Sequence, residues 1–296
     1  MTFRRTIMQS NFDSVLDSAG AGRPAKLKIR LKVALLPRDP SVPGNAGVGA
    51  QHPVHLANTE AQVRYGQMAD ANQQPVNCRS WLVYEWNAFQ IRFKKIVELA
   101  WNNQMFLLPP DGSAKEGGLS DFDFSQLVYS AKVPAYVECA LEIALMPTTA
   151  GSHAQIEVVH LAQPDLNFRA WMHRIPDSSV NITVRHKAQW DTALYQFVAA
   201  HEIGHWLHDL TKKHFEHVDA AGFRGNAQYG HVLGKRMAMM GSGTLFTEHE
   251  ARPWLGRVRR HTGALFGWTP IHRIRFNHAS DLLTDRQRQL ASVGHP

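Results

Sequence analysis

The sequence has few cysteines and no long apolar run, so it lacks the features of disulfide-stabilised and of membrane-spanning proteins. Its only two cysteines, Cys78 and Cys139, exclude a disulfide framework, and neither belongs to a CxxC metal-binding pair. They have the number needed for one disulfide, but two ordinary thiols are the simpler interpretation. No apolar run approaches the roughly 20 residues of a membrane-spanning helix, and none of secretory length follows Arg4 and Arg5. We therefore expect a soluble protein that stays in the cytoplasm or is exported without a cleavable signal peptide.

Internal repeats and low-complexity tracts are also absent, and the 44% of hydrophobic residues is enough for a substantial buried core. The net charge of +7 is concentrated toward the end, where eight arginines from Arg252 onward face only Asp281 and Asp285. A basic segment of this kind can bind nucleic acid. These arginines do not alternate with aromatic residues, as they do in proteins that bind single strands. The favoured interpretation is a solvated basic face, and we expect neither a nucleic-acid nor a membrane partner.

Alternation of apolar and polar residues predicts several strands. In residues 26–37, Leu27, Ile29, Leu31 and Val33 fall on one face of a strand, and lysines and an arginine fall on the other. This pattern is typical of a half-buried strand. Similar arguments predict strands in QMFLLPP (104–110), YVECALEIAL (136–145), QIEVVHL (155–161) and SVNITVRHK (179–187).

Helical periodicity appears twice. Between Trp81 and Asn102, apolar residues recur at helical spacing and predict an amphipathic helix of about five turns. A second helix is predicted to begin at Asp191 or Thr192, either of which can cap it, and to run to about residue 207. Residues 37–75 are rich in Pro, Gly, Asn and Gln and predict a long loop. After Gly222 the patterning weakens.

These elements together predict an α+β fold built on a twisted mixed β-sheet. We expect residues 1–25 to form a flexible N-terminal segment and residues 26–296 to form a single domain. Within this domain, an N-terminal subdomain would extend to about residue 207, and an irregular C-terminal subdomain would comprise residues 208–296.

The second helix contains the sequence HEIGH, residues 201–205. Residues four apart on a helix are separated by about 40° around the axis and about 6 Å along it, so His201 and His205 project side by side. Two imidazoles so arranged can bind one zinc ion. Glu202 lies off the ligand line but close to the metal, where a carboxylate can accept a proton from a zinc-bound water. The alternative is that both histidines are ordinary surface residues, but they continue the apolar face of Phe197 and Val198.

A catalytic zinc needs a third protein ligand and an open fourth position. His208 lies only about 20° from His201 around the helix but about 10 Å along it, too far for one ion to reach all three histidines while the helix continues. Ligands from beyond the helix remain. The sequence offers His214, His217, Asp219 and His231.

Several stretches together resemble a metzincin-type zinc metallopeptidase, in particular bacterial members of that clan. They are AAHEIGHWL, FEHVDAAG, GNAQYG, RMAMMGSG and HEARPWLGRVRRHTG, between residues 190 and 262. The metzincin signature is HExxHxxGxxH followed by a methionine turn. Here His208 stands in place of the glycine and Thr211 in place of the third histidine. An insertion of about six residues would make His217 the third ligand, with Asp219, His214 and His231 as alternatives.

The resemblance implies a metzincin-like fold and a zinc-dependent endopeptidase acting on a peptide or protein substrate. His201, His205 and His217 would hold Zn²⁺, Glu202 would be the general base, and Met240 would form the methionine turn beneath the metal. Tyr229 and His249 are candidate donors to the oxyanion, and residues 179–187 are a candidate edge strand for pairing with the substrate. The alternative function is a catalytically inactive, zinc-stabilised binding or effector module.

Overall fold

The computed structural model describes residues 4–8, 11–20, 22–38, 67–69, 75–77, 81–110, 122–129, 135–161, 170, 172–187, 192–208 and 233–272. Their strands are β1 (Arg4–Ile7), β2 (Asp13–Asp17), β3 (Ala25–Pro37), β4 (Gln67–Ala69), β5 (Pro75–Asn77), β6 (Met105–Leu108), β7 (Val137–Met146), β8 (Ala154–Val159), β9 (Arg174–Pro176), β10 (Ile182–Lys187), β11 (Thr192–Phe197) and β12 (Thr269–His272). The helices are α3 (Val83–Trp101), α5 (Val198–Leu207), α6 (Leu233–Arg236) and α7 (Glu248–Thr262), with 3-10 turns η2 (Phe124–Leu127) and η3 (Asp177–Val180).

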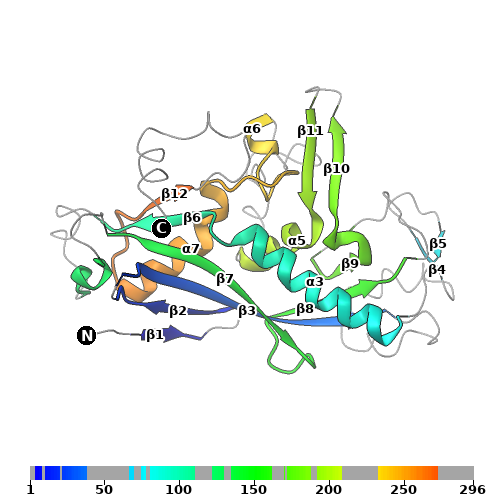
Figure 1. Ribbon diagram of the computed structural model, residues 1–296, viewed down its shortest axis with the longest axis horizontal. Helices are drawn as coiled ribbons and strands as arrows, with labels where there is room; N and C mark the ends of the chain where they lie inside the picture. The colour runs from blue at the N-terminus through cyan, green and yellow to red at the C-terminus, as the bar shows by residue number, and fades with distance from the viewer. Residues whose placement is uncertain are drawn as a thin grey trace.

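Eight of the described strands form one mixed sheet; six of them follow the order β1-β2-β3-β7-β6-β12, and β8 and β9 branch from β3 (Figure 1). The central pair, β3 and β7, is parallel, whereas β1, β2, β6 and β12 pair antiparallel to their neighbours. The second half of β3 also pairs with β8, which in turn pairs with β9, both in parallel. The prediction of an α+β fold on a mixed sheet is therefore confirmed.

The 13-residue strand β3 shows why one face of the sheet is buried. Leu27, Ile29, Leu31 and Val33 are fully buried in the main core. The polar residues between them point to the opposite face, where Lys28 forms an ion pair with Glu142 of β7 at 2.9 Å. Strands β6, β7, β8 and β10 lie where the sequence predicted strands.

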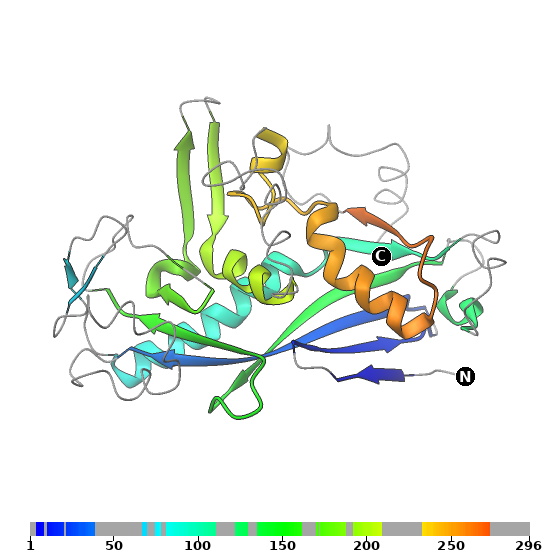
Figure 2. The ribbon, with the colours of Figure 1, turned by 180° about the vertical axis from the view of Figure 1, so that it is seen from behind.

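Helix α3 confirms the predicted amphipathic helix, and its buried face packs on β7. The Lys94 ammonium donates to the Ile143 carbonyl at 2.6 Å. The Asn102 amide, just after the helix, donates to the Leu141 carbonyl at 3.0 Å and accepts from the Leu141 N–H at 2.6 Å. These bonds fix the position of α3 along the strand. Figure 2 shows the sheet from behind with α7 (orange), which contacts β2, β3 and β12.

Three expectations were wrong. Residues 192–197 form strand β11, not the first turns of a helix, because they pair antiparallel with β10 from Ile182↔Phe197 to Lys187↔Thr192. Parts of the segment expected to be flexible, residues 1–25, form β1 and β2, and β2 brings the fully buried Leu16 into the core. Within residues 208–296, which were expected to form an irregular subdomain, the chain forms the 15-residue helix α7.

Strands β10 and β11 form a hairpin that stands away from the main sheet, with α5 following β11 directly (Figure 1).

Most of the predicted loop 37–75 and Cys78 fall outside the described residues. Cys139 is buried on β7, and burial raises the pKa of its thiol well above the usual value. No helix in the described part of the chain is both long and apolar enough to cross a membrane.

Candidate metal centre

The helix α5 carries both histidines and the glutamate of the HEIGH motif. His201, Glu202 and His205 are buried, with 5%, 6% and 7% of their surfaces exposed. The two imidazole rings lie edge to face, with centroids 5.0 Å apart. They are therefore not surface residues, and the ring arrangement is the one expected for histidines on successive turns of a helix.

The orientation of His201 is set by a backbone carbonyl. Its Nδ1 lies 2.8 Å from the carbonyl oxygen of Met239. A carbonyl only accepts hydrogen bonds, so this contact puts the ring proton on Nδ1 and the lone pair on Nε2. Histidines that bind metals through Nε2 are commonly oriented by a hydrogen bond of this kind. The geometry of His201 thus fits a metal ligand.

The carboxylate of Glu202 lies close to the second histidine. Its Oε2 is 3.9 Å from Nε2 of His205. This separation is too long for a direct hydrogen bond, and an ion or a water could bridge it. A carboxylate in this position is close to any water that enters beside the histidine nitrogens.

The floor beneath α5 is formed by a methionine. A Cβ atom added to Gly204 would lie 2.1 Å from Sδ of Met240 and 3.0 Å from Cζ2 of Trp101. Only a glycine allows the fully buried Met240 to approach the helix so closely. Trp101 also donates from Nε1 to the carbonyl of Ala200 at 3.0 Å. The thioether and the indole together support the HEIGH turn from behind.

The methionines belong to a compact turn, residues 237–243, which Glu250 of α7 holds in place. The carboxylate of Glu250 is completely buried and accepts from the Met240 N–H at 2.8 Å. It also accepts from the N–H and the hydroxyl of Thr247, at 2.8 and 2.5 Å. Sequence reasoning missed Glu250, although T-x-x-E is a recognisable signal for the start of a helix.

His208 ends α5 and does not join the other two histidines. Its backbone is extended, with φ −82° and ψ 137°. Its Nδ1 lies 2.8 Å from the Gly204 carbonyl and its Nε2 3.1 Å from the His249 carbonyl. The rings of His208 and His249 stack with centroids 4.7 Å apart. Both ring nitrogens of His208 thus lie within hydrogen-bond distance of a carbonyl oxygen, and a neutral imidazole donates to one of the two.

The predicted third ligand lies outside the described residues. His217 and its alternatives His214, Asp219 and His231 all fall between residues 209 and 232, as do Thr211 and Tyr229. Within the described ranges, no group of three or more His, Cys, Asp or Glu side chains is arranged to hold a metal ion. His201 and His205 are therefore two members of a candidate site whose third ligand stays a prediction.

Comparisons of the chain with protein-family models, curated proteins and solved structures give no match. The described part offers two buried imidazoles, one of them oriented through its Nδ1, an adjacent buried carboxylate and an apolar floor. This set suits the binding of a divalent metal and the transfer of a proton beside it.

Proposed function

We propose that the protein is a zinc-dependent endopeptidase with a metzincin-like active site. The observation that carries the proposal is the hydrogen bond between His201 and the Met239 carbonyl, because it joins the HEIGH helix to the methionine-containing turn. A surface histidine pair would have no need of such an orienting contact. His201 and His205 would bind the metal, together with His217 as the expected third ligand.

The chemistry divides between the metal and Glu202. When bound, zinc supplies a Lewis acid that lowers the pKa of its water to about 7 and polarises the substrate carbonyl. Glu202 takes a proton from the attacking water and delivers it to the leaving amine. The position of Glu202 supports this role, since its Oε2 lies 3.9 Å from Nε2 of His205 and would be close to a water held beside that nitrogen. The floor made by Met240 keeps the helix in position during these steps.

The hairpin before α5 suits an extended substrate. Among the described strands, β10 pairs with β11 alone. A strand with one unpaired edge can form backbone hydrogen bonds with a peptide and hold it in register. We assign β10 this role, with the scissile bond directed toward the start of α5.

A second candidate function is a zinc-stabilised binding or effector module without hydrolytic activity. It is favoured by one observation, the engagement of both His208 nitrogens where metzincins have a glycine. Thr211 also replaces the third histidine of the metzincin signature. In such a module, protein ligands would fill every coordination position of the metal and leave none for a catalytic water. Such a module would hold zinc and cleave no peptide.

The test is the cleavage of a diverse peptide library by zinc-loaded protein, beside the Glu202→Gln variant. We expect cuts by the wild type that decrease at least about 100-fold in the variant, because general-base catalysis contributes on that order. Zinc content, measured by mass spectrometry, should be equal in the two proteins. Cleavage retained in the variant would contradict the mechanism, whereas no cleavage by either zinc-loaded protein would favour the binding module.

A further inference from the structure

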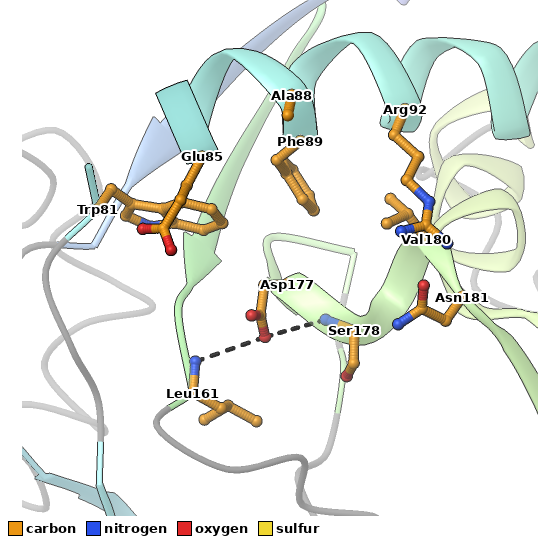
Figure 3. Close-up of a pocket in the computed structure, with 10 residues that line it drawn as sticks. All are labelled: Trp81, Glu85, Ala88, Phe89, Arg92, Leu161, Asp177, Ser178, Val180 and Asn181. Carbon is orange, nitrogen blue, oxygen red and sulfur yellow. Dashed lines mark hydrogen bonds between the residues drawn. The ribbon is translucent and has the colours of Figure 1, made fainter. Parts of the chain in front are cut away.

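A recess lies between the first half of α3 and the 3-10 turn η3, apart from the HEIGH helix. Its volume is about 380 Å³, within the range of pockets that bind small molecules. Figure 3 shows ten side chains around it, contributed by α3, by η3, by the residues that flank them and by Leu161, which follows β8. None of the HEIGH residues lines it. The recess is thus a separate candidate site.

One end of the pocket is acidic and aromatic. Glu85 and Asp177 present carboxylates there, beside the ring of Trp81 (Figure 3). Backbone N–H groups fix both carboxylates, from Leu82 to Glu85 at 3.1 Å and from Ser178 to Asp177 at 3.0 Å. A face of an indole next to two carboxylates is a suitable environment for an ammonium group.

The same end is supported from behind by His160, which is 3% exposed. Its ring stacks on Trp81 with centroids 4.2 Å apart. Its two nitrogens lie 3.8 Å from the Glu85 carboxylate and 3.5 Å from that of Asp177. The aromatic wall and both carboxylates are therefore held in one arrangement.

The opposite end of the pocket is basic. Arg92 extends from α3 toward Asn181, the residue that follows η3 (Figure 3). Within the described part of the chain, the Arg92 guanidinium has no ion pair. Arg92 is seven residues after Glu85, which places the two about 10 Å apart along the helix at 1.5 Å per residue. A guanidinium presents paired N–H donors that match a carboxylate.

The wall between the two charged ends is apolar. Ala88 and Phe89 from α3 face Val180 from η3 across the recess. An extended chain advances about 3.3 to 3.6 Å per residue, so three residues span roughly 10 Å. The spacing of Glu85 and Arg92 along the helix is therefore on the scale of a short peptide of two or three residues.

We propose that this pocket binds a short zwitterionic peptide, with its free amino group against Glu85, Asp177 and Trp81 and its free carboxylate against Arg92 and Asn181. The inference goes beyond the proposed peptidase activity and does not depend on it. It needs only the charge distribution and the dimensions of the pocket.

The experiment is isothermal titration calorimetry of the Glu202→Gln protein, which would leave any peptide uncut. The probes are Ala-Ala-Ala, its N-acetyl derivative and its C-terminal amide. We expect the tripeptide with both free termini to bind at least tenfold more tightly than either derivative, because each derivative loses one charge-assisted contact. No heat of binding with the free tripeptide, or equal affinity for all three probes, would overturn the proposal.

Two variants assign the ends of the peptide. Arg92→Ala should bind the free tripeptide and its amide equally, and Asp177→Asn should reduce the preference for the free amine over the acetylated probe. Asparagine keeps an acceptor for the Ser178 N–H, and Arg92 is exposed, so both variants should fold. Lys95→Ala, exposed on the same helix and outside the pocket, is the matched control. Unchanged preferences in the first two variants would overturn the assignment.

Discussion

Gly204 is one of the positions where α5 packs closely against the turn at residues 237–243. The distance of 2.1 Å between its hypothetical Cβ and the Met240 sulfur is far below a normal contact. A single methyl group must therefore displace the methionine or the helix. His201 is oriented by the carbonyl of the neighbouring Met239, so such a displacement would also change the orientation of this candidate ligand.

We expect Gly204→Ala to lower the free energy of unfolding by about 2 kcal/mol, the usual cost of overpacking a core. In a Met240→Ala background, the same substitution should cost less, because the sulfur that it meets is gone. Urea denaturation of the four proteins measures both effects. Gly256→Ala is the control, since nothing lies within 4 Å of a Cβ at this position of α7; it should stabilise the protein by about 0.5 to 1 kcal/mol. Equal costs of Gly204→Ala in both backgrounds would contradict the proposed contact.

At the scale of elements, Glu250 connects α7 to the turn at residues 237–243. Its carboxylate satisfies the N–H of Met240 and both donors of Thr247. It thereby caps one helix and fixes the floor under another. Because the group is completely buried, none of these bonds can be replaced by water without opening the structure.

Glu250→Gln should reduce the free energy of unfolding by about 2 kcal/mol, because an amide NH₂ would face backbone donors that now meet a carboxylate. Glu248→Gln removes the same charge from an exposed position in the same helical turn and should change stability by less than about 0.5 kcal/mol. Chemical denaturation of both variants separates the buried hydrogen bonds from the effect of helix charge. Similar losses in the two would contradict the role of Glu250.

Elements with a clear one-sided pattern could be predicted from the sequence, as β3 and α3 show. In β3 the buried residues alternate along the strand, and in α3 they recur at helical spacing. Each element can therefore be predicted from its own segment of sequence. Strand β11 could not, because residues 192–197 continue the helical spacing of α5, and only pairing with β10 makes them a strand. At the candidate site, HEIGH is recognisable locally. The contact of Met239 with His201 depends on packing between segments 38 residues apart and has no sequence signature.

At the scale of the whole molecule, the two ends of the described chain meet. Ser14 Oγ on β2 and His261 Nε2 on α7 are 2.9 Å apart, and Arg5 donates to the His261 carbonyl at 2.5 Å. Arg257 donates to the carbonyl of Phe12 at 3.0 Å. His261 is fully buried, and this burial, with smaller effects from Arg5 and Arg257, lowers its pKa to about 4.

This pKa predicts a loss of stability in acid. The folded state keeps His261 neutral, whereas the unfolded chain takes up a proton near its ordinary pKa of 6.5. The stabilisation is therefore complete above pH 6.5 and decreases as the pH falls toward 4, by up to about 3 kcal/mol. Urea titrations at pH 7, 5.5 and 4.5 measure the slope, which should be smaller in His261→Gln. An unchanged slope in this variant would assign the acid sensitivity to other groups.

The meeting of the two ends also governs when the protein can fold during its synthesis. Ser14 of β2 precedes its partner His261 by 247 residues. Strand β3 precedes its parallel partner β7 by more than a hundred residues. Contacts between segments so distant in sequence form slowly. The N-terminal strands therefore leave the ribosome long before α7 exists, so the contacts of Ser14 with His261 and of Phe12 with Arg257 form only after α7 has been made, whereas β1, β2 and β3 can pair with one another earlier.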